Sequence, residues 1–493
     1  MEALVLLVPL LFSLLFWTAK KRATTHIINI TGAIMLFVSM IYTTCSYLSN
    51  GVIEGTFLNG LFYIDSLSLI VLDIILCIGF LVCIYSVKYL DLEYDHRTID
   101  TKKIKIYYSL LYVFIFTMIT VVTTQNLGLM WIAIEATTLA SAFLVGFYNN
   151  KHSIEAAWKY IIICSVGIAF ALLGIVFLYI SSGSVFQGVK SPLNWTFLYE
   201  HAGALQSGIL KISFIFILVG FGTKVGLAPM HTWLPDAHSQ APAPISALLS
   251  GVLLNSALYG IIRILSIVNK RLGPDNLYTK RLMIGMGLLS IAAAAIFILY
   301  QKDYKRLLAY SSIEHMGIIV FALGFFTKLS IFAALFHMIN HAFTKSMLFL
   351  LSGNVYLKYG TKEIKKVNGL LKIMPVTGTV FLLGLFAIAG MPPFSVFFSE
   401  LSVGLSAASA YHYVLASIFL VLVAVIFAGI AVTTLKMFFG NAVSNDVQSG
   451  EINRLGLTVI LLLFAIITVT GVYMPEPVKN IVDSAVLIIK GGN

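Results

Sequence analysis

Charged residues are scarce in this sequence. Asp, Glu, Lys and Arg make up 11% of its 493 residues, whereas soluble domains carry roughly 25%. Hydrophobic residues make up 59%, and the mean hydropathy is +0.95. This balance excludes an ordinary soluble domain and predicts an all-α, polytopic membrane protein in contact with the lipid bilayer.

Cysteine is also scarce. The four residues, Cys45, Cys77, Cys83 and Cys164, all lie in apolar runs, and no Cys-x-x-Cys pair offers thiolates to an iron–sulfur cluster. No glycine-rich phosphate loop follows a strand pattern. We therefore expect no cofactor and no metal in this chain, and we expect any redox chemistry to belong to other subunits.

Long apolar runs follow one another almost from end to end. A membrane-spanning helix needs about 20 apolar residues, and the runs predict about fourteen spans, near 3-18, 26-46, 64-87, 107-124, 128-147, 156-181, 209-230, 243-268, 282-300, 307-326, 329-353, 373-407, 411-438 and 456-474. The first run lacks a basic region before it and a small-residue cleavage site after it. We expect it to be retained.

The net charge of +11 has two interpretations. A nucleic-acid partner is one, but the basic residues cluster in alternate loops, which indicates the excess of Lys and Arg on the cytoplasmic side of membrane proteins. We therefore expect no nucleic-acid partner, a place in the cell inner (cytoplasmic) membrane, and both termini outside. The loop with Lys270, Arg271, Lys280 and Arg281 breaks the alternation.

Ionisable residues lie inside several predicted spans. Lys224 lies in span 209-230, and Glu135 lies in span 128-147. A charge at the bilayer centre costs roughly 2.5–3.5 kcal/mol on insertion scales, so such residues usually face protein or water and mark an ion pathway. The others are Lys159, Glu314, His337, His341, Lys345 and Glu400.

Two of the spans contain helix-breaking residues. Glycines at 220, 222 and 226 precede Pro229 in the first, and 231-238 reads as a loop; in the second, residues 390-396 split the run 373-407. Paired broken helices point to the transport site of a repeat-built carrier. A weak repeat supports two halves, since Glu135 and Glu314 lie 179 positions apart, and Lys224 and Glu400 lie 176 apart.

Four motifs make a family resemblance specific. They are KVGLAPMHTWLPDAH at 224-238, DYKRLLAYSS at 303-312, HAFTK at 341-345 and AGMPPF at 389-394. They resemble the antiporter-like subunits of respiratory complex I and its Mrp relatives from about residue 60 to 440. SIEH at 312-315, LLN at 253-255 and PPFSVFFSE at 392-400 are closest to the membrane arm of group 4 NiFe-hydrogenases, the formate hydrogenlyase type.

The resemblance implies a domain organisation. Three N-terminal helices would occupy residues 1-106. Two inverted five-helix repeats would follow, spans 4-8 at 107-268 and spans 9-13 at 282-438, with spans 7 and 12 broken. A last helix and a short tail would occupy 456-493.

The resemblance also implies roles for the buried polar residues. Glu135 and Lys224 would form a pair whose separation changes as protons load and leave, with Lys159 beside it. His337, His341 and Lys345, spaced for one helix face, would be axis residues, and Glu400 would be the exit. Asp236 and His238 would lie at the mouth of the first half-channel. Asn255 stands where many complex I members have lysine, which puts one relay step in doubt.

Other interpretations stay open at this point. Glu135 and Lys224 could be a structural ion pair, and Glu314 could only neutralise Lys305. His231 and His238 could be interfacial loop residues. His337 and His341 have a metal-ligand spacing, although no third ligand is evident. The segment 475-490 reads as an interfacial tail.

The first functional reading is a proton-translocating, non-catalytic subunit of a membrane-bound hydrogenase complex. Its partners would be other antiporter-like and small membrane subunits and hydrophilic NiFe-hydrogenase and iron–sulfur subunits, and it would move protons or Na⁺. The alternatives are a subunit of an Mrp-type cation/proton antiporter, an antiporter-like subunit of complex I (NADH-quinone oxidoreductase), and an inert spacer in a membrane arm.

Overall fold

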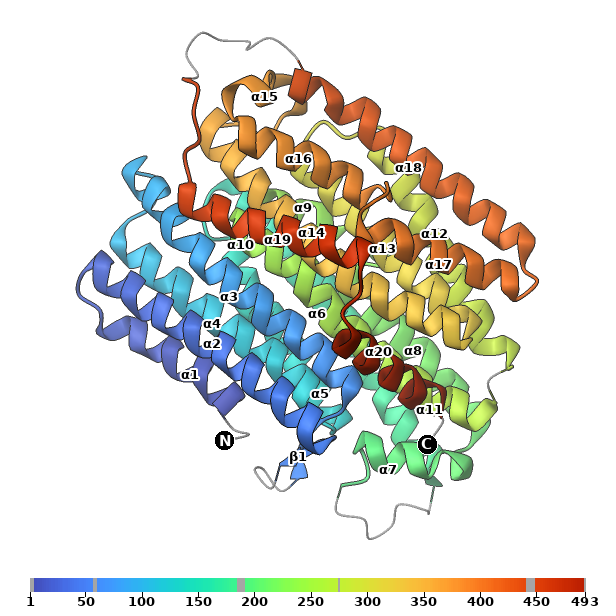
Figure 1. Ribbon diagram of the computed structural model, residues 1–493. Helices are drawn as coiled ribbons and strands as arrows, with labels where there is room; N and C mark the ends of the chain where they lie inside the picture. The colour runs from blue at the N-terminus through green and yellow to red at the C-terminus, as the bar shows by residue number, and fades with distance from the viewer. Residues whose placement is uncertain (1–3, 56–59, 184–190, 274, 440–447, 492–493) are drawn as a thin grey trace.

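Long apolar helices that run side by side dominate the structure (Figure 1), because a helix satisfies all its backbone hydrogen bonds where lipid offers none. The computed structural model describes residues 4–55, 60–183, 191–273, 275–439 and 448–491. In the first half the helices are α1 Leu4–Leu15, η1 Phe16–Thr18, α2 Arg22–Asn50, α3 Ser66–Asp95, α4 Thr101–Thr123, α5 Leu127–Val145, α6 Lys151–Ser181, α7 Trp195–Glu200, η4 Ala202–Ala204, α8 Ser207–Val225, α9 Trp233–Gln240, α10 Ala243–Leu248, η5 Leu249–Leu253 and α11 Leu254–Leu272.

The second half continues the same architecture. Its helices are α12 Leu277–Ile298, α13 Tyr304–Phe325, α14 Lys328–Tyr359, η6 Ile364–Lys366, α15 Leu370–Ile373, α16 Pro375–Ile388, α17 Ser395–Ser409, α18 Tyr413–Phe439, α19 Arg454–Val472 and α20 Glu476–Lys490. The described strands, β1 Ile53–Gly55 and β2 Phe62–Ile64, form an antiparallel hairpin in which Ile53 pairs with Ile64.

The all-helical membrane class is confirmed. Among the described residues, eleven helices are long and apolar enough to cross a membrane, counting α10 to α11 as one, and Leu4–Thr18 and Pro375–Ile388 are shorter apolar helices. The total of fourteen spans stays a prediction, because α14 is 32 residues long but too polar to meet the same criterion, and the run 373-407 is divided between α16 and α17.

Both interrupted spans are broken where the glycines and prolines indicated. Helix α8 ends at Val225, and Gly226 follows with a positive φ of 82° that favours glycine. Helix α16 ends at Ile388, Gly390 has a φ of 72°, and α17 begins at Ser395. The expectation of a loop over 231-238 was wrong in part, because α9 begins at Trp233.

Two further elements were not expected from the sequence. The span 243-268 contains a π-helical turn, η5, between α10 and α11; such turns are frequent at functional sites. The segment 475-490 forms α20, which packs against α3, α14 and α11 and buries Ile481, Val482, Ala485, Val486 and Ile489.

The helices of the two expected repeats contact one another in the same order. In the first range α4 packs on α5, and α6 packs on α8 and α9; in the second, α12 packs on α13, and α14 packs on α16 and α17. On this division Glu135 on α5 is expected to correspond to Glu314 on α13, and the broken pair α8–α9 to α16–α17. The division of the chain into 107-268 and 282-438 stays a prediction that these contacts support.

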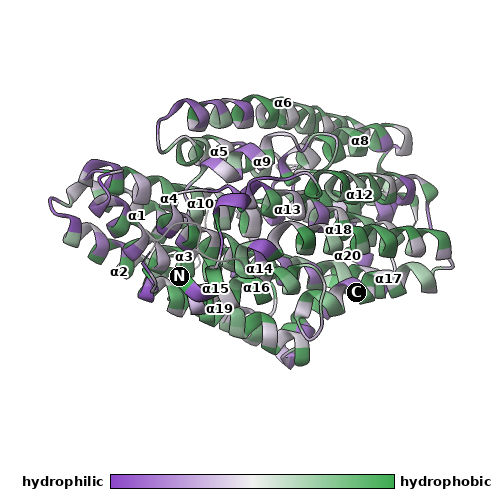
Figure 2. Cartoon of the chain, turned by 90° about the horizontal axis from the view of Figure 1, so that it is seen from above, coloured by the Kyte–Doolittle hydropathy of each residue, from purple (hydrophilic) through white to green (hydrophobic). Residues whose placement is uncertain are grey.

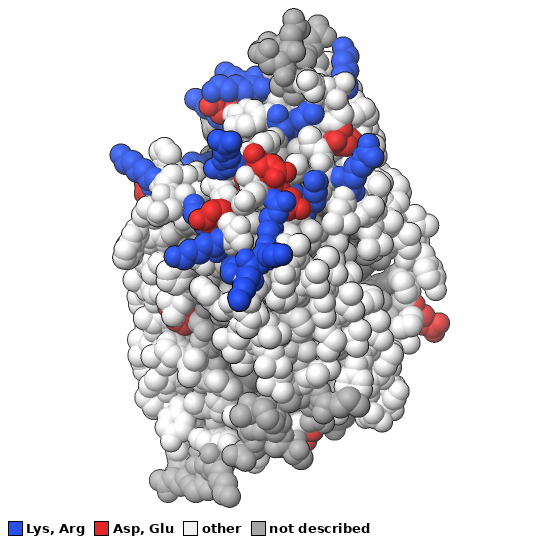
Figure 3. All heavy atoms as spheres, turned by 90° about the vertical axis from the view of Figure 1, so that its left-hand side faces the viewer, with Lys and Arg blue, Asp and Glu red and all other residues white. Residues whose placement is uncertain are grey.

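Basic residues gather at one end of the bundle. Figure 3 shows Lys and Arg, with a few Asp and Glu, on the upper part of the face at the left-hand side of Figure 1. The α1–α2, α3–α4, α12–α13 and α14–η6 connections supply these residues, including Lys20, Lys102, Arg306, Lys358 and Lys365. We call this end the basic face. Both termini lie at the other end, beside β1 and α7 (Figure 1).

The loop that broke the charge alternation lies at that other end and has local partners. The Lys270 ammonium lies 3.9 Å from the centroid of the Tyr199 ring, and Arg271 Nε donates to the Leu205 carbonyl at 2.7 Å. These two cations hold the segment around α7 and η4 against α11.

The helices differ in how much of their surface the protein covers. The most hydrophobic windows of α18 and α6 are 28% and 39% buried, whereas those of α13 and the α10–α11 helix are 94% and 100% buried. Outer helices such as α6, α12 and α18 are largely hydrophobic in Figure 2. The enclosed helices are therefore where polar side chains can find protein partners.

Close packing of α6 against α8 depends on a glycine. A Cβ at Gly220 would collide with the Ala171 backbone nitrogen, whereas a Cβ at Gly208 on the same helix would meet nothing within 4 Å. We expect Gly220→Val to force α6 and α8 apart and to destabilise the protein by about 1–3 kcal/mol. The measurement is thermal unfolding of the purified protein in detergent, with Gly208→Ala as the control. Equal melting temperatures for the two variants would contradict this packing.

Candidate functional site

Lys224 lies in the last turn of α8 and is completely buried. Its Nζ donates to Thr138 Oγ1 at 2.8 Å and to the Tyr160 hydroxyl at 2.6 Å, and it lies 4.6 Å from the centroid of the Tyr160 ring. The Ser141 hydroxyl lies 2.7 Å from the same tyrosine oxygen. Hydroxyl groups and a ring face from α5 and α6 thus take the place of water around the ammonium.

Glu135 reaches this lysine through a hydroxyl group. Ser165 Oγ donates to Glu135 Oε1 at 2.7 Å, and Thr138 Oγ1 donates to Oε2 at 3.1 Å. No direct ion pair joins Glu135 to Lys224 in the described part of the chain. The order is Lys224 N–H to Thr138 oxygen and Thr138 O–H to Glu135, so one hydroxyl connects the cation and the carboxylate.

Lys159 does not join this pair. Its side chain is 47% exposed, and its Nζ lies 2.7 Å from Glu155 and 3.2 Å from Asp236. Arg306 binds the other Asp236 oxygen at 2.5 Å. The expectation of a buried charge at 159 was therefore wrong: Lys159 and Asp236 form an exposed ionic cluster, because Trp158 and Lys159 lie on the outer side of α6 while Tyr160 turns inward.

A second group of buried titratable residues begins at Lys305, in the first turn of α13. Its Nζ donates to the Ala241 carbonyl at 2.7 Å. His238, on α9, stacks on Phe349 at 4.8 Å, has no hydrogen-bond partner on either ring nitrogen among the described residues, and lies within electrostatic reach of both Lys305 and Lys345. His238 therefore lies between two buried cations. His231, at the start of the segment, packs beside Phe297 and Tyr310.

Lys345 continues this group on α14. It is completely buried, its Nζ donates to the Leu308 carbonyl at 3.0 Å, and Glu314 on α13 is within electrostatic reach. Ser311 donates to the Glu314 carboxylate at 3.3 Å. Glu314 therefore faces Lys345, and Lys305 is not its partner among the described contacts.

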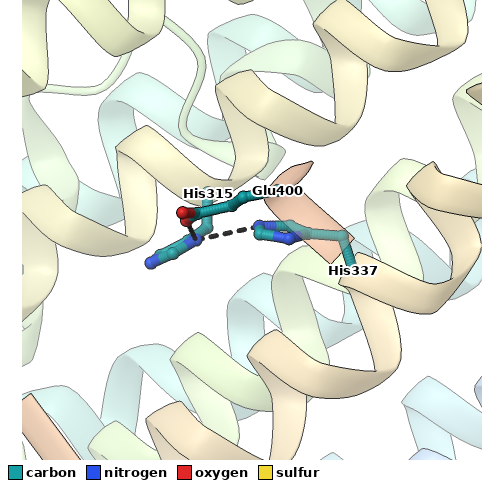
Figure 4. A group of neighbouring side chains, drawn as sticks. All are labelled: His315, His337 and Glu400. Carbon is teal, nitrogen blue, oxygen red and sulfur yellow. Dashed lines mark hydrogen bonds and ion pairs between the residues drawn. The ribbon is translucent and has the colours of Figure 1, made fainter. Parts of the chain in front are cut away.

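His315 lies at the centre of the group and was missed as a candidate residue. Its Nδ1 lies 2.9 Å from His337 Nε2 and 3.9 Å from Glu400 Oε1 (Figure 4). Its Nε2 lies 4.0 Å from the Glu314 carboxylate. The His341 ring centroid lies 5.4 Å from that of His315. The sequence signals were its position directly after Glu314 and its place in the SIEH motif at 312-315.

Glu400 reaches the histidines because the broken helix gives it room. A Cβ at Gly390 would collide with Glu400 Oε2, so the carboxylate occupies the space that a side chain at 390 would fill. His337 Nδ1 pairs with Ser399 Oγ at 2.9 Å, one position before Glu400. The break in the span thus brings a carboxylate from α17 to the histidines of α13 and α14.

The geometry also changes the metal interpretation. The expected pair, His337 and His341, does not converge; instead His315, His337 and Glu400 bring ligand atoms within 4.8 Å of one another. Two of these atoms already share a hydrogen bond, His315 Nδ1 with His337 Nε2. An imidazole–imidazole hydrogen bond with an adjacent carboxyl group is an arrangement through which a proton can be passed.

Asn255 lies buried in the first turn of α11. Its Nδ2 donates to Gly251 O at 2.8 Å and to Met338 O at 3.5 Å, and its Oδ1 has no partner among the described residues. A buried acceptor without a donor is a place where an ordered water fits. The amide faces α14 one residue away from His337.

The sequence is similar to known membrane subunits over most of its length. Residues 124–427 match the family described as NADH:quinone oxidoreductase/Mrp antiporter, TM, and residues 55–97 match complex I chain 5 N-terminus. The hydrogenase-4 component F homolog of Methylacidiphilum infernorum is 38% identical over 87% of this chain and 89% of its own length.

Two other relatives are more distant. One of the Na(+)/H(+) antiporter subunits of Alkalihalophilus pseudofirmus is 31% identical over 80% of this chain, but the chain spans only 49% of that protein. A chain of an archaeal membrane-bound sulfane sulfur reductase superposes with a TM-score of 0.86 at 26% identity, over 99% of this chain and 97% of that one. The resemblance drawn from the sequence motifs is confirmed, and the chain belongs to the NADH:quinone oxidoreductase/Mrp antiporter family of multi-pass membrane subunits.

Proposed function

We propose that the chain is a proton-translocating subunit in the membrane arm of a hydrogenase-type membrane complex. In this proposal the chain has no redox site of its own, and redox chemistry in other subunits drives the proton translocation. The 38% identity to a hydrogenase-4 component F homolog, and the likeness to a chain of a respiratory membrane complex, support this assignment. The basic face would be cytoplasmic and both termini outside, as the positive-inside rule predicts.

The observation that carries the proposal is the second group of buried titratable residues. Lys305, His238, Lys345, Glu314, His315, His337 and Glu400 follow one another across α9, α13, α14 and α17, each within a hydrogen bond or electrostatic reach of another. Charged groups in the hydrocarbon region are costly and usually mark proton relays. We call this series the buried relay.

The chemistry of the buried relay favours H⁺ over Na⁺. Hard cations bind through several oxygen atoms. A lysine ammonium offers donors only, and an imidazole offers one nitrogen acceptor. The lysines and histidines of the series therefore suit a group that exchanges protons, whereas they would repel or fail to ligate a sodium ion.

Lys224 and Glu135 would act as a switch beside the buried relay. A lysine changes its protonation readily when its surroundings change, and the hydroxyl of Thr138 connects it to the carboxylate. When Glu135 lies close, the charged lysine is favoured; when it withdraws, the lysine releases its proton. Moving one charge against 100 mV costs roughly 2.3 kcal/mol, which the partner subunits must supply.

The proposed partners follow from the same assignment. They are other antiporter-like and small membrane subunits and hydrophilic NiFe-hydrogenase and iron–sulfur subunits. The second candidate function is a subunit of an Mrp-type cation/proton antiporter, which the 31% identity to the Na(+)/H(+) antiporter protein of Alkalihalophilus pseudofirmus favours. Purification of the intact complex separates the two, because only the first would contain nickel and iron–sulfur clusters.

The first prediction from the proposed function tests the switch formed by Glu135, Thr138 and Lys224. In vesicles that contain the intact complex, Lys224→Ala should reduce proton uptake during redox turnover to background. Thr138→Val should reduce uptake about tenfold, because a hydrogen bond to a charged group contributes roughly 1.5–3 kcal/mol. Uptake is followed with a pH-sensitive dye.

Thr137→Val is the matched control, since the Thr137 hydroxyl donates to the Ile134 carbonyl of its own helix. Normal proton uptake by the Lys224→Ala complex would rule out a role for the lysine. Equal losses for the two threonine variants would show that packing, rather than the connection to Glu135, matters.

The second prediction concerns Glu400 and Asn255. Glu400→Gln should stop proton uptake because an amide cannot be protonated at neutral pH, and Glu400→Asp should retain part of it. Asn255→Leu should impair uptake if a water completes the path beside its free oxygen, and Asn255→Lys should be tolerated. Ser402→Ala is the control, because the Ser402 hydroxyl donates to the Phe398 carbonyl of its own helix.

Uptake that survives Asn255→Leu but not Glu400→Gln would mean that protons bypass α11. Uptake that survives both changes would favour the spacer interpretation over translocation.

A further inference from the structure

A polar cavity lies at the basic face, next to Lys305. Its volume is about 280 Å³, and its lining includes Glu93, Tyr148, Gln240, Lys305 and Lys362. Thr98 and Asn150, which also line it, are exposed at the α3–α4 and α5–α6 connections. The cavity therefore connects the surface of the basic face to the first residue of the buried relay, and it is large enough for several waters.

Glu93 is a buried carboxylate in the lining of this cavity, and the packing of the helices alone does not explain it. It lies near the end of α3 and is 2% exposed. The Tyr148 hydroxyl donates to Glu93 Oε1 and lies 3.1 Å from the Tyr89 hydroxyl. Oε2 has no hydrogen-bond partner in the described structure. A buried carboxylate that served only to hold helices together would be expected to have both oxygens satisfied.

The two lysines that line the cavity with Glu93 also have N–H groups without a hydrogen-bond partner among the described residues. Lys305 Nζ donates to Ala241 O at 2.7 Å, and Lys362 Nζ donates to Ser239 O at 2.6 Å. Each ammonium has three N–H groups, so both can donate to water in the cavity. Burial lowers the pKa of Lys362. Lys305 is within electrostatic reach of Glu93 and Lys362, and the next titratable group inward is His238.

We propose that this cavity is the water-filled entrance to the buried relay and that Glu93 takes up protons there from the basic face. A hydrated proton would bind the Glu93 carboxylate. The resulting carboxylic acid would transfer its proton through cavity water to a neutral Lys305 amine, which regenerates the carboxylate and forms the ammonium. Tyr148 and Tyr89 are positioning residues that hold one Glu93 oxygen and leave the other free. This inference rests on the proposed function.

The positions of the two ends of the buried relay support proton transfer from the cavity toward Glu400. The cavity begins at exposed residues of the basic face, where water and protons are available, and ends at a buried lysine. Glu400, at the other end of the buried relay, lies on α17, and no described residue of α17 lines the cavity. An acid at the mouth and a second acid at the far end give the series an entrance that is distinct from its exit.

The first arm of the test measures access, which does not depend on proton transport. Gln240→Cys places a thiol in the cavity without touching a titratable group. A charged, membrane-impermeant thiol reagent added from the basic face to the intact complex should modify it. Ser346→Cys, completely buried on α14, is the control and should stay unmodified. Failure to modify residue 240 would overturn the entrance.

The second arm measures transport in vesicles. Glu93→Gln should lower proton uptake per redox turnover by about a hundredfold, the lower end of acid–base contributions, and Glu93→Asp should restore most of it. Tyr148→Phe should have a smaller effect, because it leaves the carboxylate in place. Normal uptake by Glu93→Gln would overturn the role of Glu93.

Failure of this inference can be told from failure of the proposed function. If Lys345→Ala and Glu400→Gln stop uptake while Glu93→Gln does not, only the entrance is wrong. If none of the three changes affects uptake, the translocation function itself is wrong. If the Glu93→Gln loss is not rescued by Glu93→Asp, the residue is structural, and the inference is overturned.

Discussion

The constraint on which the rest of the structure depends is that a charge inside the bilayer must find its partners within the protein. No water is available there to solvate an ammonium or a carboxylate. Lys224, Lys345 and Glu314 are accordingly at most 1% exposed, and each contacts a hydroxyl group, a carbonyl group or an opposite charge. The enclosed helices α13 and α14 carry most of these residues, while helices such as α6 and α18 present apolar side chains outward. The arrangement of the bundle is thus the means by which a few polar side chains are kept away from lipid.

The broken helices follow from the same constraint. A break leaves backbone carbonyls free at the end of the preceding helix, and a buried donor uses one of them: Trp233 donates to Thr223 O near the end of α8. At the second break, Asn340 donates to the Ser395 carbonyl in the first turn of α17. The break also removes steric bulk, because the Glu400 carboxylate occupies the space beside Gly390. The first break therefore supplies an acceptor for a buried donor, and the second supplies the room that the Glu400 carboxylate occupies.

The sequence predicted what depends on residues close together in the chain. Hydrophobic runs predicted where most of the helices lie, although some ends differ by several residues, as in the run 64-87 that forms Ser66–Asp95. Glycine with proline predicted both breaks. It could not predict contacts between helices. Thr138 connects Glu135 to Lys224, yet a threonine in an apolar run carries no signal of its own. Lys159 read as a buried charge because its neighbours are apolar, but the helix turns it outward, whereas Tyr160 turns inward. The roles of His315 and Glu93 depend on contacts between helices. His315 contacts His337 across α13 and α14, and Glu93 on α3 contacts Tyr148 in the α5–α6 connection.

The short helix α9 lies between the two groups of buried charges. At one end of α9, Trp233 packs at 4.7 Å on Tyr160, whose hydroxyl accepts a hydrogen bond from Lys224. At the other end of α9, His238 lies between Lys305 and Lys345. Helix α9 spans eight residues, which is about 12 Å at roughly 1.5 Å per residue. A shift of Tyr160 that follows a change at Lys224 would therefore move Trp233 and, through the rigid helix, the His238 imidazole. Under the proposed function, a change in the Glu135–Thr138–Lys224 switch would be transmitted to the buried relay through α9. The helix holds Trp233, which contacts Tyr160, and His238, which belongs to the buried relay, at a fixed distance from each other. A loop over 231-238 would not fix that distance.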